Sequence, residues 1–251
     1  MTKPSLSHSE PRVSEAVILM AGPGSRLRTD GMSLPKPLAP VLGRPLVSYT
    51  LEALGRAGIK NVHCVIGFQR DLIKARVRPL IPAELDVCFI ENRDWQKQNG
   101  ISVLAAVNHV EPPFLLIMSD HLFDQSILDL LLRTAVPEQV NLAIDRKLDS
   151  IFDLTDAMKV GTCGDRIITM GKDLSSYDAI DTGLFVCPDD IFGYLERARR
   201  NGDCSLADGV RLMAGADKVR GVDIGDAWWQ DVDTPEMLQH AEKQMQTAQF
   251  K

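Results

Sequence analysis

The sequence predicts an α/β fold in which a mostly parallel, doubly wound sheet carries a small antiparallel appendage. Short apolar runs alternate with helical patterns through the first half of the chain, as in repeated β–α units. These runs are apolar throughout, which is typical of strands covered by helices on both faces. In the second half, short strand-like runs follow one another at the spacing of hairpins. No repeat, low-complexity segment or flexible linker divides the chain, so we expect a disordered leader over residues 1–14 and a single domain over residues 15–251.

The first half is expected to alternate strands with helices. Ala16–Met20 is a continuous apolar run that ends in a glycine-rich segment, which is typical of a buried strand followed by a loop. Pro45–Ala57 has apolar residues at helical spacing and stops before Gly58, a common helix terminator. The other strands are expected at Val62–Ile66, Val87–Ile90 and Phe114–Met118, and the other helices at Leu72–Leu80 and Ile101–His109.

The second half is expected to contain shorter strands and further helices. The strands are Val140–Ile144, Ala157–Val160, Arg166–Met170, Gly183–Val186 and Val219–Ile224, and the helices are Asp189–Arg200, Leu206–Met213 and Pro235–Gln249. Ligands of open α/β sheets bind beyond the carboxyl ends of the parallel strands. The residues that follow Met20, Ile90 and Met118 are therefore where we expect the chemistry.

Composition excludes several classes of protein. The 251 residues are 45% apolar and 25% charged with a net charge of −6, which is ordinary for a globular protein and provides no basic surface for nucleic acid or membrane. The five cysteines are widely spaced without a C-x-x-C pair, so we expect reduced thiols rather than disulfides or a zinc site. No apolar run approaches the ~20 residues that cross a bilayer, and the polar N-terminus lacks the apolar core of a signal peptide. A cytoplasmic protein is expected, and its oligomeric state is not indicated.

A glycine-rich loop follows the first expected strand. It reads Ala21-Gly22-Pro23-Gly24-Ser25-Arg26-Leu27, and Leu34-Pro35-Lys36-Pro37-Leu38 comes shortly after it. It is neither a P-loop, which needs a closing Gly-Lys-Ser/Thr, nor a dinucleotide fingerprint, because Leu27 stands where the third glycine belongs. Glycines let backbone N–H groups approach phosphate oxygens, and Arg26 and Lys36 supply full positive charges. The alternative is a tight β–α turn with two surface cations. Prolines on both sides of Lys36 favour the phosphate-binding interpretation.

These segments resemble the Gly-x-Gly-Ser/Thr-Arg-Leu and Pro-Lys-Pro-Leu motifs of sugar-phosphate nucleotidyltransferases. The resemblance implies a Rossmann-like, GT-A-like nucleotidyltransferase fold with Arg26 and Lys36 as catalytic residues. It also implies that the loop binds a nucleoside triphosphate through Ala21, Gly22, Gly24, Ser25, Arg26 and Lys36. Met20 and Pro23 depart from the family pattern, and a loop remodelled by Pro23, which has no N–H, would bind nucleotide more weakly.

Two aspartates are candidate metal ligands. Asp120 directly follows a buried strand, where its hard carboxylate suits Mg²⁺, although an aspartate can also simply turn the chain. The resemblance implies the metal role. A second carboxylate is expected from the segment 228–234, where Asp231 and Asp233 alternate. Because Asp233 or Thr234 lies just before an expected helix and is placed to cap it, we assign Asp231 to the metal and Asp233 either to structure or to support of the metal site.

Polar residues after the third expected strand are candidates for reading the nucleotide base. They are Asn92, Asn99, Gly100 and Ser102. An amide side chain can bind a base edge, but Asn-Gly also forms plain turns before helices. The sequence does not distinguish a pyrimidine from a purine.

Segments of the second half closely resemble inositol-1-phosphate cytidylyltransferases. They are 143–146, 156–160, 171–172, 177–183 and 229–234, and the resemblance spans roughly Ala16–Ala241. It implies CTP as nucleotide, Mg²⁺ as cofactor and a small phosphorylated acceptor. Residue by residue, it implies that Arg146, Lys159 and Lys172 bind the acceptor phosphate and that Asp181 binds acceptor hydroxyls. Solvated surface lysines and a turn aspartate are the alternatives.

The predicted reaction is the Mg²⁺-dependent transfer of a cytidylyl group from CTP to inositol 1-phosphate, with release of pyrophosphate. One alternative is a nucleotidyltransferase for another acceptor, such as 2-aminoethylphosphonate, 2-hydroxyethylphosphonate, phosphocholine or a sugar 1-phosphate. A second alternative is a non-catalytic protein that senses nucleotide through the same loop. Such a protein would usually have lost Lys36, Asp120 or Asp231, and all three are present.

Overall fold

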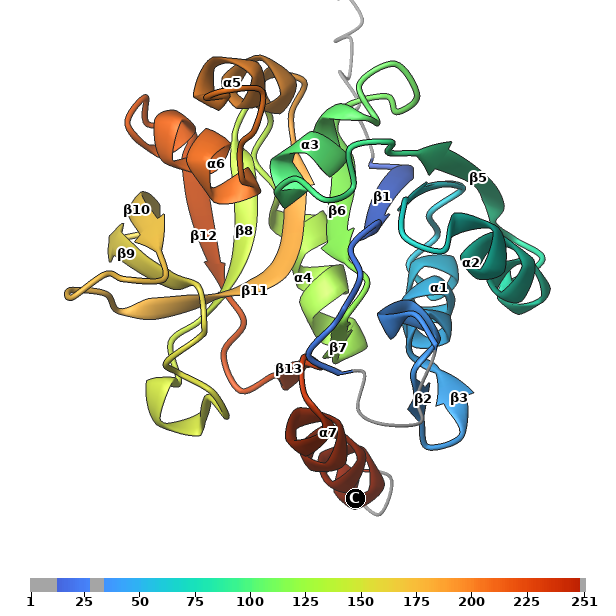
Figure 1. Cartoon of the computed structure of the whole chain (residues 1–251). Helices are drawn as coiled ribbons and strands as arrows, with labels where there is room; N and C mark the ends of the chain where they lie inside the picture. The colour runs from blue at the N-terminus through green and yellow to red at the C-terminus, as the bar shows by residue number, and fades with distance from the viewer. Residues whose placement is uncertain (1–12, 28–33, 249–251) are drawn as a thin grey trace, which may run out of the picture.

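A computed structural model describes residues 13–27 and 34–248. Residues 1–12, which make up most of the expected leader, lie outside the described residues. The core of the fold is one nine-stranded sheet with the strand order β5-β4-β1-β6-β11-β8-β12-β10-β9 (Figure 1). Its strands are β1 (Glu15–Met20), β4 (Asn61–Ile66), β5 (Asp86–Glu91), β6 (Phe114–Met118), β8 (Val140–Asp145), β9 (Lys159–Cys163), β10 (Arg166–Gly171), β11 (Ala179–Cys187) and β12 (Val219–Asp223).

The two halves of the sheet differ in direction. Strands β5, β4, β1 and β6 are parallel, as the first half of the sequence predicts. Strand β11 then runs antiparallel to both β6 and β8, and β9 and β10 form an antiparallel pair at the far edge. The antiparallel strands therefore extend the main sheet, which makes it a mixed sheet.

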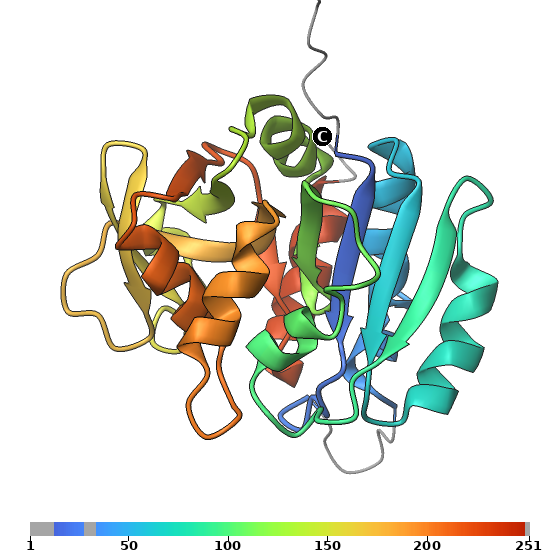
Figure 2. The same ribbon diagram turned by 90° about the horizontal axis from the view of Figure 1, so that it is seen from above.

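Helices cover both faces of the sheet (Figures 1 and 2). One face is covered by α3 (Asn99–Leu104), α5 (Asp190–Ala198) and α6 (Leu206–Ala214), and the other by α1 (Leu46–Arg56), α2 (Arg70–Val77) and α4 (Gln125–Thr134). Successive residues of β1 alternate between these two cores, with Val17 and Leu19 in the first and Ile18 and Met20 in the second. This explains why β1 is apolar at every position from Ala16 to Met20.

Two short two-stranded sheets stand outside the main sheet. β2 (Pro40–Val41) pairs with β3 (Arg44–Pro45), and β7 (His121–Phe123) pairs with β13 (Trp229–Asp231). The β7–β13 pairing places Asp231 opposite His121, and α7 (Pro235–Ala248) follows it. Short 3-10 helices occur at η1 (Lys36–Leu38), η2 (Arg78–Leu80) and η3 (Leu148–Ser150).

The order of elements follows the sequence prediction with local differences. Helix α2 ends at Val77 and continues as η2, because Pro79 cannot donate a backbone hydrogen bond. Helix α3 ends at Leu104 rather than near His109, and the following residues form tight i→i+3 bonds, among them Ala106 N–H to Val103 C=O at 3.0 Å. Helix α4 and the β7–β13 pair were not expected. No helix in the described part of the chain is long and apolar enough to cross a membrane.

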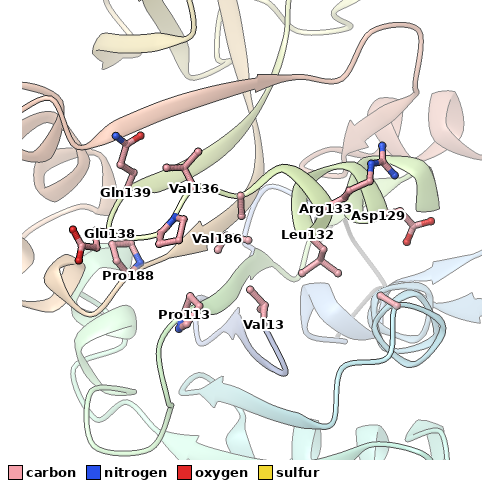
Figure 3. A pocket seen from close by; sticks show the side chains of 13 residues that line it. Val13, Pro113, Asp129, Leu132, Arg133, Val136, Glu138, Gln139, Val186 and Pro188 are labelled. Atoms are coloured by element: carbon pink, nitrogen blue, oxygen red, sulfur yellow. The ribbon is translucent and has the colours of Figure 1, made fainter. Parts of the chain in front are cut away.

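A cavity of about 510 Å³ opens at the amino-terminal edge of the parallel strands (Figure 3). Val13 precedes β1, Pro113 precedes β6 and Gln139 precedes β8 in its wall. Its charged side chains, such as Asp129 and Arg133, are exposed on α4. The loops that carry the predicted chemistry lie at the opposite, carboxyl-terminal edge.

Candidate active site

The loop after β1 is shaped by a glycine in the left-handed region. Gly24 has φ of +55°, and a Cβ atom there would lie 2.4 Å from the Lys36 Cβ, so only glycine fits. The loop therefore packs directly on η1, where Leu38 N–H bonds to Pro35 C=O at 2.8 Å. This contact fixes the position of Lys36 relative to the loop.

Lys36 lies buried between two carboxylates, with only 7% of its surface exposed. Its Nζ donates to Asp120 Oδ2 at 2.5 Å and to Asp233 Oδ1. Burial acts to lower the pKa of Lys36, but the two aspartates outweigh it and raise that pKa. Burial likewise acts to raise the pKa of Asp120, but Lys36 and His121 outweigh it and hold that pKa well below its usual range. The site therefore contains a fixed ammonium between ionised carboxylates.

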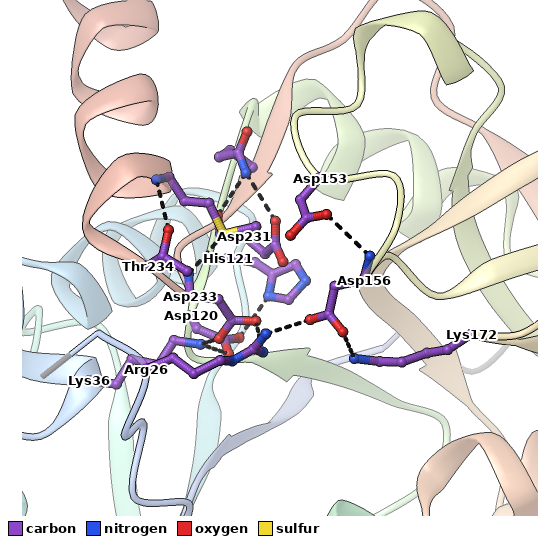
Figure 4. A network of polar contacts seen from close by, with 12 residues as sticks. Arg26, Lys36, Asp120, His121, Asp153, Asp156, Lys172, Asp231, Asp233 and Thr234 are labelled. Atoms are coloured by element: carbon purple, nitrogen blue, oxygen red, sulfur yellow. Dashed lines mark hydrogen bonds and ion pairs between the residues drawn. The ribbon is translucent and has the colours of Figure 1, made fainter.

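Arg26 extends this network across the mouth of the site (Figure 4). Its Nη1 donates to Asp156 Oδ2 at 2.6 Å and its Nη2 to Asp233 Oδ2 at 2.6 Å. Lys172 Nζ donates to the other oxygen of Asp156 at 2.5 Å. These side chains thus form a continuous chain of ion pairs: Lys172, Asp156, Arg26, Asp233, Lys36 and Asp120.

The β7–β13 pair brings Asp231 next to Asp120. Val232 N–H bonds to Asp120 C=O at 2.8 Å, and His121 Nδ1 lies 2.7 Å from Asp120 Oδ1. Burial is the main cause that raises the pKa of Asp231, and the neighbouring Asp233 and Asp120 add to it although His121 opposes them. Two acidic side chains that are distant in sequence therefore line the same part of the site, and one of them, Asp231, has a raised pKa.

The sequence left Asp233 either a structural role or a supporting role in the site, and its contacts with Lys36 and Arg26 correspond to the supporting role. Thr234, rather than Asp233, serves the helix end: its Oγ1 accepts a hydrogen bond from Met237 N–H at 3.3 Å. The Asp233 carboxylate is thereby free to bind both Lys36 and Arg26. Its position just before the helix pointed to capping, but the side chain turns toward the cations.

His121 is held as rigidly as the aspartates. Its ring is stacked on Trp229 with centroids 5.7 Å apart, and Gly183, with φ of +77°, lies beneath it. A Cβ at Gly183 would come within 2.6 Å of His121 Nε2. Asp120 raises the pKa of His121 against the opposing effect of burial. The imidazole therefore orients Asp120.

Two cavities meet at this network, and we name them by their walls. The loop cavity, of about 320 Å³, is lined by the β1 loop together with Lys36, Ser119, Asp120 and Asp233. The inner cavity, of about 250 Å³, is lined by α6, β10 and β11 residues together with Asp120, Asp231 and Asp233. Asp120 and Asp233 belong to both walls.

The structure places most of the predicted loop residues on the loop cavity. These are Gly22, Gly24, Ser25, Arg26 and Lys36. Ala21 is buried, 3% exposed, beneath the loop, and its C=O accepts from Phe68 N–H at 2.9 Å. Pro23 lines the cavity as well.

The predicted base-reading residues make internal contacts. Asn92 Nδ2 donates to Ser102 Oγ at 2.9 Å, and both side chains are buried. Asn99 Oδ1 accepts from Leu206 N–H at 2.8 Å, and Asn99 also lines the inner cavity. A Cβ at Gly100 would lie 2.6 Å from Cys204 C=O, so this glycine serves the packing of α3 on the segment before α6.

The predicted acceptor residues divide into two groups. Lys172 and Asp181 line the inner cavity, and burial raises the pKa of Asp181 to about 6. The structure does not bring Arg146 or Lys159 to this cavity. Arg146 binds Asp178, and Lys159 Nζ donates to the backbone carbonyl of Thr155 at 3.0 Å. A cation beside a strand cannot be assigned to a face from the sequence alone, which explains the difference.

Asp156 is a residue of this site to which the sequence interpretation gave no role. The segment that contains it, 156–160, carried the resemblance, but its partners Arg26 and Lys172 are far away in sequence. Its pKa is lowered against the effect of burial because both cations bind it. The available signal was the recurrence of aspartates at positions 149, 153 and 156.

A Rossmann-like sheet with a glycine-rich first loop, two fixed cations and convergent carboxylates defines a nucleotidyltransferase. Residues 16–151 match the MobA-like NTP transferase domain. The chain belongs to this family. Nucleotidyltransferases of this class generally use a divalent metal ion.

Similar proteins agree with this assignment. The chain is 33% identical over 230 residues to the "Bifunctional IPC transferase and DIPP synthase" of Rubrobacter xylanophilus, covering 91% of this chain and 51% of that protein. It is 30% identical over 232 residues to the protein of the same name from Aquifex aeolicus, covering 92% and 51%. The chain thus spans about half the length of these curated relatives.

A solved structure extends the similarity to almost the whole fold. The inositol-1-phosphate CTP transferase from T. maritima superposes with a TM-score of 0.83 at 26% identity, covering 94% of this chain and 96% of that one. A UDP-glucose pyrophosphorylase complexed with UDP-glucose has a TM-score of 0.76 at 16% identity, over 94% and 99% of the two chains, and shares the fold.

Proposed function

We propose that this protein is a Mg²⁺-dependent cytidylyltransferase that converts CTP and inositol 1-phosphate to CDP-inositol and pyrophosphate. One observation carries the proposal: two cavities share Asp120 and Asp233 as a common wall, and cations stand on the loop side of it. Such a division suits two anionic substrates that must meet at one phosphorus atom. The similarity to a CTP transferase for inositol 1-phosphate supports the choice of nucleotide and acceptor.

The carboxylates fit a divalent metal ion. Asp120 and Asp231 provide hard oxygen donors on adjoining chain segments, and burial together with the neighbouring Asp233 and Asp120 raises the pKa of Asp231, which a bound cation would offset. Residues 13–27 and 34–248 contain no group of three or more side chains already arranged to hold a metal ion. Mg²⁺, however, is commonly held by one or two carboxylates plus substrate phosphates. When bound, the ion would polarise phosphate oxygens and offset their charge.

The cations of the β1 loop would hold the triphosphate. Arg26 presents a planar fork and Lys36 a compact charge, and the glycines at 22 and 24 let backbone N–H groups approach. Both cations have carboxylate partners in this structure, so their positions are set before any phosphate arrives. Their charge stabilises the pyrophosphate as it departs.

The inner cavity would hold the acceptor. Lys172 offers a cation for its phosphate, and Asp181 and Asn99 offer oxygens for hydroxyl groups. An acceptor phosphate oxygen attacks the α-phosphorus, and no general base is needed because a phosphate monoester is already anionic near neutral pH. The chain then contributes positioning and charge neutralisation. We assign this chemistry to a single cytoplasmic domain over residues 15–251.

The test is pyrophosphate release from a panel of nucleotides and acceptors. The panel combines CTP, UTP, GTP and ATP with inositol 1-phosphate, glucose 1-phosphate, phosphocholine and 2-aminoethylphosphonate, in Mg²⁺ and in excess chelator. We expect release above background with CTP and inositol 1-phosphate, dependent on metal. A higher rate with another pair would replace the substrate assignment, and CTP binding without product from any acceptor would overturn the enzymatic one.

A further inference from the structure

A second polar cluster lies at the amino end of β1, away from the candidate active site. Glu15 begins β1, His63 lies in β4 and Cys88 lies in the edge strand β5. His63 and Cys88 are direct partners in the β4–β5 register. The distance from His63 Nδ1 to Cys88 Sγ is 3.0 Å, and that from His63 Nε2 to Glu15 Oε2 is 3.0 Å. A thiol, an imidazole and a carboxylate are therefore in line.

Of the three side chains, the thiol is the accessible one. Glu15 and His63 are 7% and 8% exposed, whereas Cys88 is exposed. The sulfur can thus meet a reagent from solvent, while the imidazole and the carboxylate stay behind it. Nucleophile, base and orienting group occur in this order in catalytic triads.

Hydrogen bonds to Glu15 determine which nitrogen of His63 carries the proton. Glu15 accepts from Glu111 N–H at 2.8 Å and from Asn61 Nδ2 at 3.0 Å. Burial acts to raise the pKa of Glu15, but these bonds and His63 lower it, so Glu15 is an ionised carboxylate. A carboxylate only accepts, so His63 Nε2 is the protonated nitrogen. The lone pair of Nδ1 then faces Cys88.

The resting sulfur is a thiol. Partial burial raises the pKa of Cys88, and the carboxylates of Asp86 and Glu15 add to this effect. The S–H group therefore donates to His63 Nδ1, and the sulfur becomes nucleophilic as the imidazole takes its proton. A packing contact alone would not require a base aligned on an accessible thiol, as His63 is aligned on Cys88.

We propose that Cys88 is a thiol-modification site that exchanges with small disulfides, with His63 as its general base and Glu15 as a positioning residue. The proposal stands independently of the nucleotidyltransferase reaction. Asp86 adds negative charge on the same strand two residues before the thiol, so a cationic or uncharged disulfide is the class of reagent that fits.

The exchange balances without any further reactant. His63 Nδ1 takes the proton from Cys88, Sγ attacks one sulfur of the disulfide, and the S–S bond breaks. The leaving thiolate takes the proton from His63 and departs as a free thiol. The products are one mixed disulfide on Cys88 and one small thiol, with no net change in oxidation state.

The experiment treats the intact protein with cystamine, a cationic disulfide, and follows each cysteine by peptide mass spectrometry. Cys163, which is also exposed, provides an internal reference on β9. In the wild type we expect Cys88 to react faster than Cys163. His63→Gln is expected to slow Cys88 by about ten-fold or more, the loss of a general base, and to leave Cys163 unchanged.

Glu15→Gln tests the positioning role with the imidazole retained. The oxygen that bonds to His63 also accepts from Glu111 N–H, so the variant's amide oxygen keeps that place and accepts from Nε2 as a neutral group. The proton of His63 is then held less strongly at Nε2, and we expect a slower Cys88 reaction together with a larger share of Nδ1-protonated imidazole in ¹⁵N spectra of the His63 ring. Circular dichroism and thermal unfolding of each variant identify any loss of fold.

Two results would overturn the proposal. One is a Cys88 that reacts no faster than Cys163 in the wild type. The other is an unchanged Cys88 rate in folded His63→Gln. If His63→Gln does not fold, the Glu15→Gln rate and ring spectrum decide in its place, and an unchanged rate there rejects the relay. Cys88→Ser is expected to leave pyrophosphate release unaffected, because the cluster lies at the far end of β1.

Discussion

The loop cavity and the inner cavity share two aspartates but differ in how their charges are balanced. On the loop side, Lys36 and Arg26 are each bound to two carboxylates. On the inner side, burial raises the pKa values of Asp181 and Asp231, and among the described residues the cavity is lined by one lysine, Lys172, and by His121. The difference shows that the loop side is organised in advance by its own counter-ions. The inner side retains acceptor oxygens that suit hydroxyl groups and a metal ion.

Asp120 lines both cavities, so its loss is expected to have the largest effect. Asp120→Asn keeps the shape of the side chain but removes the charge that binds Lys36 and that, in the proposed mechanism, would bind a metal ion. We expect pyrophosphate release to fall by about 10³-fold or more with a normal circular dichroism spectrum. Turnover retained at saturating Mg²⁺ would remove Asp120 from the mechanism.

Lys36→Met removes a cation from the loop cavity and leaves the side chains of the inner cavity in place. Asp120 and Asp233 would then face each other without the buried cation, so we expect turnover to fall about 10²-fold and the unfolding free energy to drop by about 3 kcal/mol. Chemical denaturation and pyrophosphate release measure the two effects. Lys60→Met, at an exposed lysine, is the matched control. Normal stability of Lys36→Met would contradict the account of the buried ion pairs.

Arg26→Lys sharpens the contrast between a buried cation and an exposed one. The Arg26 side chain is 52% exposed, and a lysine cannot span Asp156 and Asp233 as a fork. We expect the KM for CTP to rise about ten-fold while stability changes little, since exposed ion pairs contribute little. Steady-state kinetics with varied CTP provides the measurement, and an unchanged KM would place Arg26 outside the nucleotide site.

Lys172→Met and Arg146→Met form a matched pair on the acceptor side. Lys172 lines the inner cavity, whereas Arg146 binds Asp178 away from it. We expect the KM for the acceptor to rise about five-fold in Lys172→Met, a typical loss for one exposed charge contact, and to stay unchanged in Arg146→Met. The opposite ranking would show that the acceptor binds beside β8 instead.

Asp181→Asn is expected to change stability as a function of pH. The folded pKa of Asp181 is raised to about 6 from 3.8, so its ionisation disfavours the fold as pH rises through that interval. Relative to the wild type, the variant should gain up to about 2 kcal/mol of stability between pH 4 and pH 7. Urea unfolding at several pH values measures the difference, and a pH-independent difference would contradict it.

The sequence predicts a strand of the sheet well where the apolar pattern lies within that strand itself. β6 and the part of β1 from Ala16 are continuous apolar runs, and residues that follow each of them line the loop cavity of the candidate site. Helix α4 was missed although Ile127, Leu128 and Leu131 show the helical spacing. Strands β7 and β13 are too short for any periodicity, and their pairing depends on a contact between distant segments.

The same physical limit applies to the site. Arg26, Lys36 and Asp120 are predictable because each lies just beyond a buried strand or beside a fixed loop. The roles of Asp156 and Asp233 depend on which way a side chain turns and on partners far along the chain. Spacing within a segment contains no such information, so these two residues emerge only from the fold.

The short β7–β13 ribbon has a consequence for the order in which the protein becomes competent. Its two strands come from opposite ends of the later chain, and their backbone hydrogen bonds help to place Asp231 beside Asp120. During synthesis, the nucleotide loop and the first aspartate emerge long before their acidic counterpart. A nascent chain that stops short of Trp229 would lack both Asp231 and Asp233, the carboxylate that binds Lys36 and Arg26, so competence would arrive only with the final segments.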